Sequence, residues 1–185
     1  LAERLGAPVC CNYQHNDAFP GSHPLAAGPL GYNGSKAAME LISRADVVLA
    51  LGTRLNPFST LPGYGIDYWP KDARLIQVDI NADRIGLTKK VDVAIQGDAR
   101  RVAEQLLTQL SVNAGDQGRA QRADLIAKCK SDWASELADM DHEEDDPGTT
   151  WNQRSRDDKP ERMSPRQAWR AIMKALPREA IISSD

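Results

Sequence analysis

Three glycines recur at every third position in the segment Gly28-Pro29-Leu30-Gly31-Tyr32-Asn33-Gly34, and Ser35 follows them directly before a helical pattern. Glycine has no side chain, so its backbone N–H groups can approach a ligand closely, and a serine-capped helix N-terminus favours an anion. The spacing differs from the G-x-G-x-x-G pattern of dinucleotide sites. Two interpretations of Gly28, Gly31, Gly34 and Ser35 therefore stay open: an anion-binding turn, or a tight turn whose geometry needs glycine.

A second glycine-bearing segment, Gly52-Thr53-Arg54, follows the apolar run Val47–Leu51. Such a run is typical of a strand covered on both faces in a parallel sheet, and open sheets of this kind bind ligands beyond the carboxyl ends of their strands. There the Arg54 guanidinium would hold a phosphate or carboxylate with two hydrogen bonds, or else pair with an acidic neighbour. Asp79 and Asp98 lie where ribose or phosphate would be bound, or act only as helix caps.

The densest polar stretch, residues 14–25, contains two histidines, an amide, a carboxylate and two prolines. Long loops stiffened by proline are often functional in compact domains. No Ser/His/Asp or Cys/His arrangement is evident in it. A metal bound by His15, Asp17 and His23 is the weaker interpretation, and His142, in an acidic run, has no defined ligand spacing and is expected to be solvated.

The surrounding pattern alternates strands and helices. We predict strands over 8–12, 47–51, 75–80 and 91–95, helices over 36–45 and from Asp98 to Leu110, the end of a helix over 1–5, and a long loop over 13–33. This order predicts an α/β fold, with an open, mostly parallel, Rossmann-like sheet and helices on both faces.

The part of the chain after residue 112 does not continue this alternation of strands and helices. We assign residues 1–112 to this first domain and 113–163 to an acidic connector that includes a helix over 123–137. Residues 164–185 would start a second α/β domain, because Ser164-Pro165-Arg166-Gln167 forms a capping box before the apolar stripe Trp169, Ile172, Met173 and Leu176, and a strand is predicted over 180–184. Since the first residues are already helical and an apolar run precedes Asp185, we expect an internal piece of a longer polypeptide.

Composition excludes several classes of protein. The 185 residues carry a formal net charge of −3, so nothing indicates nucleic-acid binding. No apolar run approaches the roughly 18–20 residues of a membrane helix. Three cysteines without a Cys-x-x-Cys pattern favour small buried thiols in a reducing cytoplasm.

The order of these motifs resembles the central domain of the thiamine-diphosphate enzymes related to acetolactate synthase. The likeness rests on the His23-Pro24-Leu25 loop, the glycine turn, the segment Ala45–Leu55, Ile76–Asn81 and Gly97-Asp98-Ala99. In Tyr13–Leu25, Gly31–Lys36 and Leu55–Pro70 it is closest to family members that act on sulfoacetaldehyde.

The resemblance implies an enzyme that converts sulfoacetaldehyde and phosphate to acetyl phosphate and sulfite in taurine and organosulfonate catabolism. It implies thiamine diphosphate and Mg²⁺ as cofactors, with the activating glutamate before Leu1 and a Gly-Asp-Gly metal motif after Asp185. It also implies a cytoplasmic homo-oligomer, a dimer or tetramer, and a fragment that is inactive alone. The alternatives are another thiamine-diphosphate enzyme, such as acetolactate synthase or a decarboxylase, or a nucleotide-binding module without catalysis.

The same resemblance assigns residues. His15 and Asn16 match a loop near the active site and would face the substrate. The segments Gly28–Ser35 and Gly52–Arg54, with Asp79 and Asp98, match a flavin-binding crevice that is expected to be vestigial here. Asp185 would lie at the edge of the diphosphate site.

Overall fold

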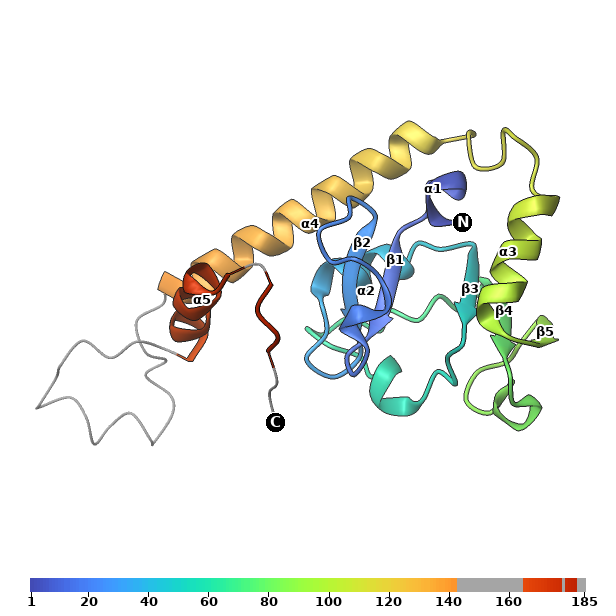
Figure 1. Cartoon of the computed structure of the whole chain (residues 1–185), viewed down its shortest axis with the longest axis horizontal. Coiled ribbons are helices and arrows are strands. Elements are labelled where there is room, and N and C mark those ends of the chain that lie inside the picture. Colours follow the sequence, from blue (N-terminus) through green and yellow to red (C-terminus); the bar gives the residue numbers. More distant parts are fainter. Residues whose placement is uncertain (143–164, 178, 183–185) are drawn as a thin grey trace, which may run out of the picture. The chain divides into compact units, whose positions relative to one another are not determined.

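A computed structural model describes residues 1–142, 165–177 and 179–182 (Figure 1). The chain divides into two compact units, residues 1–133 and 134–185. The elements of the first unit follow in this order: α1 (Ala2–Leu5), β1 (Val9–Asn12), η1 (Asn16–Ala18), β2 (Ala26–Leu30), α2 (Lys36–Ile42), β3 (Val47–Leu51), η2 (Pro57–Thr60), β4 (Arg74–Asp79), η3 (Ala82–Arg84), β5 (Val93–Gln96), α3 (Ala99–Gln109) and the larger part of α4 (Arg119–His142).

Every named strand pairing is parallel, which confirms the α/β class. The strands form two small sheets, β1-β2 and β3-β4-β5, where one continuous sheet was expected. The segment 13–33 is not all loop, because β2 runs alongside β1 within it. The register of this pair shifts between Val9 and Cys10, so Ala27 is an extra residue and Gly28 takes a φ of 99°. A short Ala-Ala-Gly-Pro-Leu strand with a bulge has neither the alternation nor the β-branched residues that reveal a strand.

The prediction that β3 is covered on both faces is wrong for the described chain. Val47 and Leu51 are exposed and only Ala50 is buried, whereas β4 buries Leu75, Gln77, Val78 and Asp79. The physical reason is position, since β4 lies between two strands and β3 lies at an edge of its sheet.

Two helix starts follow the sequence prediction. The Ser35 hydroxyl accepts a hydrogen bond from the Ala38 N–H at 3.3 Å, and the Asp98 carboxylate accepts one from the Arg101 N–H at 2.9 Å. These bonds satisfy backbone donors that the first turn of a helix leaves unpaired. Helix α2 ends at Ile42, three residues before the predicted end, and the Gly6 C-cap of α1 is left-handed with a φ of 60°.

The main core joins elements that are distant in sequence. Ala27 and Leu30 of β2, four residues of α2, Tyr68, and Ile126 and Cys129 of α4 form one buried cluster. The helix that was predicted over 123–137 extends from Arg119 to His142 in the structure. Its first part, up to Trp133, belongs to the first unit. The boundaries assigned to the connector and to the two domains stay predictions.

The second unit contains α5 (Pro165–Ala175). The predicted apolar stripe is exposed, and its last residue directly follows the helix: Trp169, Ile172, Met173 and Leu176. The strand predicted over 180–184 is not formed by residues 180–182, because no described strand is there to pair with them. Ser164, Ser183, Ser184, Asp185 and the acidic residues 143–146 lie outside the described residues. None of the described helices has the length and apolarity needed to cross a membrane.

Candidate functional site

Two predicted site segments meet at the carboxyl edge of the β1-β2 sheet. Asn12, which ends β1, lies opposite Leu30, which ends β2, and the rings of Tyr13 and Tyr32 pack edge to face with centroids 6.4 Å apart. The loop holding His15 and Asn16 therefore starts beside the glycine turn. Both side chains are exposed, and neither has a hydrogen-bond partner in the part of the chain that the structure describes.

The glycine turn is shaped by contacts with the protein's own backbone. Gly31 has a φ of 79°, and a Cβ there would lie 2.1 Å from the Phe58 carbonyl oxygen. The Tyr32 N–H donates to that same oxygen at 2.9 Å. A Cβ on Gly34 would lie 2.8 Å from the carbonyl oxygens of Gly31 and Pro29. Close backbone packing thus accounts for Gly31 and Gly34, as the tight-turn interpretation expects.

The second group of predicted residues gathers at the carboxyl ends of β3 and β4. The Gly52 N–H donates to the Val78 carbonyl oxygen at 2.8 Å, and the Gly97 N–H donates to the Asp79 carbonyl oxygen at 3.0 Å. Gly52, Asp79 and Asp98 therefore lie at one edge of the sheet. Asp79 is buried and its Oδ1 accepts from the Asn81 N–H at 2.9 Å, while Asp98 is exposed and caps α3.

Thr53 and Arg54 differ in their contacts with the rest of the protein. The Thr53 hydroxyl accepts from the Leu55 N–H at 3.2 Å and so serves the local turn. The exposed guanidinium of Arg54 has no hydrogen-bond or ion-pair partner among the described residues, so the acidic neighbour that the alternative interpretation requires is not among them. The arrangement leaves a planar cation free to bind an anion at the end of β3.

A buried amide that the sequence analysis missed holds this edge together. Gln77 in β4 donates from Nε2 to the carbonyl oxygens of Thr53, at 3.0 Å, and Arg84, at 3.2 Å, while its Oε1 accepts from the Gly86 N–H at 2.9 Å. The residue is 2% exposed. A lone amide in the apolar strand Leu75-Ile76-Gln77-Val78 is the signal that could have found it, because a buried amide needs partners.

An open hollow adjoins the start of α3 and is lined by Ile80, Asp98, Arg100, Arg101 and Glu104. Arg100 donates to Glu104 at 2.9 Å, and this contact raises the pKa of the exposed guanidinium. The hollow thus combines both signs of charge next to the strand ends.

His15 and His23 do not form a metal centre with the side chains that the structure describes around them. The Nδ1 atom of His23 accepts from the Leu25 N–H at 3.1 Å and its Nε2 lies 3.2 Å from the Glu3 carboxylate, so both ring nitrogens are engaged. No group of three or more His, Cys, Asp or Glu side chains suited to a metal ion occurs among the described residues.

Tyr68 lies beneath the glycine turn. It is 1% exposed, and its hydroxyl faces the Gly31 backbone without a hydrogen-bond partner among the described residues. Burial raises the pKa of Tyr68 to about 12.

Residues 1–106 match the family described as "Thiamine pyrophosphate enzyme, central domain". The chain belongs to the thiamine pyrophosphate enzymes. The match covers every strand that the structure describes and all but the end of α3, so the parallel strands and the loops at their carboxyl ends are those of a thiamine pyrophosphate enzyme central domain. The predicted family is thereby confirmed.

Individual proteins of the family are similar to the chain in sequence. The sulfoacetaldehyde acetyltransferase of Roseovarius nubinhibens is 75% identical over all 185 residues, and that of Castellaniella defragrans is 49% identical over 187 aligned residues that include the whole chain. A probable acetolactate synthase large subunit of Methanocaldococcus jannaschii is 38% identical over 110 residues, 60% of the chain. The chain spans about a third (31%) of the length of the two acetyltransferases.

Proposed function

We propose that this chain is part of a sulfoacetaldehyde acetyltransferase, which converts sulfoacetaldehyde and phosphate to acetyl phosphate and sulfite. The observation that carries the proposal is the 75% identity, which extends over the whole chain. The acetolactate synthase relative matches over 110 residues only, at 38% identity. The likeness to the acetyltransferases therefore includes residues beyond the central domain.

The family implies thiamine diphosphate, and we propose Mg²⁺ as its metal. When bound, thiamine diphosphate supplies the carbanion that the chemistry needs at the aldehyde carbon. The described residues do not fit this group, since they include no cluster of acidic and histidine side chains suited to a metal ion. The cofactor and its metal would be held by other residues, with Asp185 at the edge of the diphosphate site.

Within this chain, we propose that His15 and Asn16 face the substrate. Support comes from their exposed side chains, which have no partner among the described residues, and from their place beside the glycine turn. An imidazole and an amide offer hydrogen bonds to a sulfonate or a carbonyl oxygen. Their role is to bind and orient the anionic aldehyde.

The edge formed by Gly52, Thr53, Arg54, Asp79 and Asp98 is a second candidate site, for a nucleotide that is not consumed. The free guanidinium of Arg54 at the end of β3 supports it. The sequence resemblance assigns Gly28, Gly31, Gly34 and Ser35 to the same crevice. Titration calorimetry of the full-length protein with ADP and with flavin tests the site, and absence of heat with both would show that the crevice is vestigial.

The proposed activity is tested on the purified full-length protein that contains this chain. With sulfoacetaldehyde, phosphate, thiamine diphosphate and Mg²⁺ present, we expect sulfite release that stops when phosphate is left out. His15→Gln and Asn16→Ala should each lower kcat/KM for sulfoacetaldehyde about tenfold or more, as loss of a hydrogen bond to a charged group would. Unchanged values in both variants would remove these residues from the site.

We further propose a cytoplasmic homo-oligomer, a dimer or tetramer. Support for the compartment comes from Cys10, Cys11 and Cys129, which are all free thiols. Light scattering of the active full-length protein tests the assembly, and an active monomer would contradict it.

A further inference from the structure

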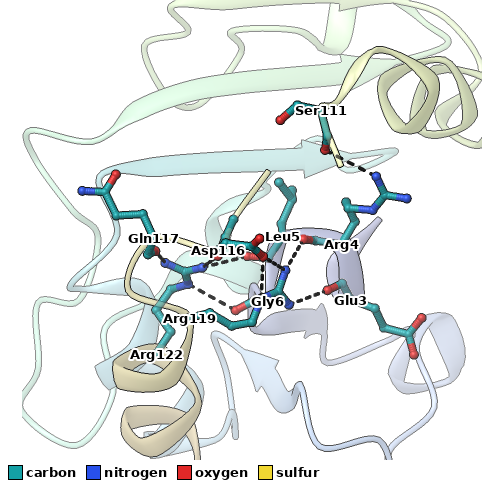
Figure 2. A network of polar contacts seen from close by, with 10 residues as sticks. Glu3, Arg4, Leu5, Gly6, Ser111, Asp116, Gln117, Arg119 and Arg122 are labelled. Atoms are coloured by element: carbon teal, nitrogen blue, oxygen red, sulfur yellow. Dashed lines mark hydrogen bonds and ion pairs between the residues drawn. The ribbon is translucent and has the colours of Figure 1, made fainter. Parts of the chain in front are cut away.

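Helix α4 starts with an arginine clamp on α1 (Figure 2). Arg119 donates to the carbonyl oxygens of Glu3, at 2.9 Å, and Arg4, at 2.6 Å, while Arg122 donates to those of Leu5, at 3.0 Å, and Gly6, at 3.4 Å. Arg122 also bonds the Gln117 carbonyl oxygen at 2.6 Å and that of Gly115. Cations suit the carbonyl end of a helix, and these bonds fix the start of α4 in the first unit.

The middle of α4 is fixed by burial. Ile126 and Cys129, each 3% exposed, pack in the core that includes Ala38 and Met39 of α2. Residues three apart lie on one face of a helix, so this contact sets the rotation of α4 about its axis. The directions of Lys130 and Trp133 follow from that rotation.

Lys130 reaches the end of the polar stretch 14–25. Its ammonium donates to the carbonyl oxygens of His23, at 3.3 Å, and Pro24, at 3.1 Å. These two carbonyls belong to the last part of the loop that holds His15 and Asn16, just before the start of β2 at Ala26. Lys130 therefore ties the carboxyl end of the loop to a helix that is itself anchored at its start and middle.

Trp133 reaches the glycine turn through Tyr64. The two rings pack edge to face with centroids 5.0 Å apart, and the Tyr64 hydroxyl donates to the Gly34 carbonyl oxygen at 2.9 Å. Tyr64 has a φ of 53°, a conformation that a bulky residue adopts only when its surroundings hold it there. The ring contact and the hydrogen bond are the contacts that hold this residue against the turn.

We propose that Lys130 and Trp133 are positioning residues for the substrate-facing loop and for the glycine turn beside it. The expected effect on kinetics rests on the proposed function, whereas the positioning of the two loops does not. One helix thus sets the place of two loops that are far from it in sequence. Because misplacing a bound substrate by about 1 Å can cost on the order of a hundredfold in rate, such contacts matter without touching the substrate.

Lys128 provides a matched control for Lys130. It lies on the same helix, is exposed, and forms an ion pair with Asp132 at 2.7 Å, a surface contact of little energetic value. In the full-length protein, Lys130→Met should speed hydrogen exchange at the amides of His23, Leu25 and Ala26 about tenfold, since it removes a charged donor from two carbonyls. Lys128→Met should leave these amides unchanged.

Trp133 is tested by loss and rescue. Trp133→Leu should speed exchange at the amides of Gly34 and Ser35 about tenfold, and Trp133→Phe, which keeps an aromatic edge for Tyr64, should restore most of the protection. The Lys130 variant should leave Gly34 and Ser35 unaffected. This crossed pattern separates local positioning from a general loss of stability.

The kinetic readout is kcat/KM for sulfoacetaldehyde. We expect a roughly tenfold fall in Lys130→Met and in Trp133→Leu. The thermal midpoint of Lys130→Met should lie close to that of Lys128→Met, whereas Trp133 packs against the main core, so Trp133→Leu is compared with Trp133→Phe. Exchange rates equal to those of the control, or equal acceleration at every amide of the first unit, would overturn the inference. If the wild-type protein released no sulfite, the proposed function would fail, while the exchange pattern would still decide the inference.

Discussion

Arg122 donates a hydrogen bond to the carbonyl oxygen of Leu5 at 3.0 Å, across 117 residues of sequence. The helix that follows the family-matched region is thereby tied to α1 at the beginning of the chain (Figure 2). Gly115 allows this approach, because a Cβ there would lie 2.4 Å from the Leu5 carbonyl oxygen. The segment that leads into α4 is therefore part of the first unit.

The clamp predicts a local effect of Arg122→Met. Loss of charged hydrogen bonds to several carbonyls should lower the opening free energy of α1 by about 1.5–3 kcal/mol. Hydrogen exchange at the Gly6 and Ala7 amides measures it. Arg100→Met is the control, because the contact of Arg100 with Glu104 is an exposed ion pair far from α1 in sequence. An equal effect of both variants would contradict the prediction.

The glycine turn predicts that Gly31→Ala is strongly destabilising. The new Cβ would collide with the Phe58 and Ser59 backbones, in addition to the strain of a positive φ. We expect a loss well above 2 kcal/mol in urea unfolding, against about 1–2 kcal/mol for Gly65→Ala, which has a φ of 70° but nothing within 4 Å. Similar losses in the two variants would show that backbone contact is unimportant at Gly31.

The buried hydroxyl of Tyr68 predicts that Tyr68→Phe stabilises the protein. An unpartnered buried polar group costs about 1–3 kcal/mol, and phenylalanine keeps the ring while removing the hydroxyl. Urea unfolding should show a gain of about 1 kcal/mol. Tyr64→Phe should show the opposite sign, since it loses the bond to Gly34, and a destabilised Tyr68→Phe would indicate that the hydroxyl has a partner.

Alkaline pH should weaken the fold. Burial raises the pKa of Cys10 from its ordinary value of 9.0 to about 12, and that of Tyr68 from 10.0 to about 12. The folded chain then holds these protons more tightly than the unfolded chain, so their contribution is complete below pH 9 and is lost as pH rises toward 12. Urea unfolding at pH 8.0, 9.5 and 10.5 should show a free energy of unfolding that falls as pH rises. The fall with pH should be smaller in Cys10→Ala and in Tyr68→Phe than in the wild-type protein. An equal fall in all three proteins would contradict this prediction.

Local signals predicted much of the fold. The apolar runs around Val48, Ile76 and Ile95 gave strands within two residues of their observed bounds, and Ser35 and Asp98 cap the helices that they were expected to cap. These features depend on neighbours in sequence, which a pattern contains. Strand β2 was missed because its pairing with β1, not its composition, makes it a strand.

The site was predicted less well, because its contacts are long-range. Gln77 bonds both Thr53 and Gly86. Lys130 bonds His23, and Tyr64 bonds Gly34. The sequence contains no regular spacing that would predict these contacts. The exposed first and last residues of β3 were not predicted for the same reason, because the burial of a strand depends on which elements pack around it.

The ratio of kcat/KM for sulfoacetaldehyde to that for pyruvate, measured on the full-length protein with phosphate, thiamine diphosphate and Mg²⁺, tests the central claim most directly. The proposed function predicts a ratio far above one, with sulfite and acetyl phosphate formed in equal amounts. Consumption of pyruvate in preference, without sulfite release from sulfoacetaldehyde, would contradict it.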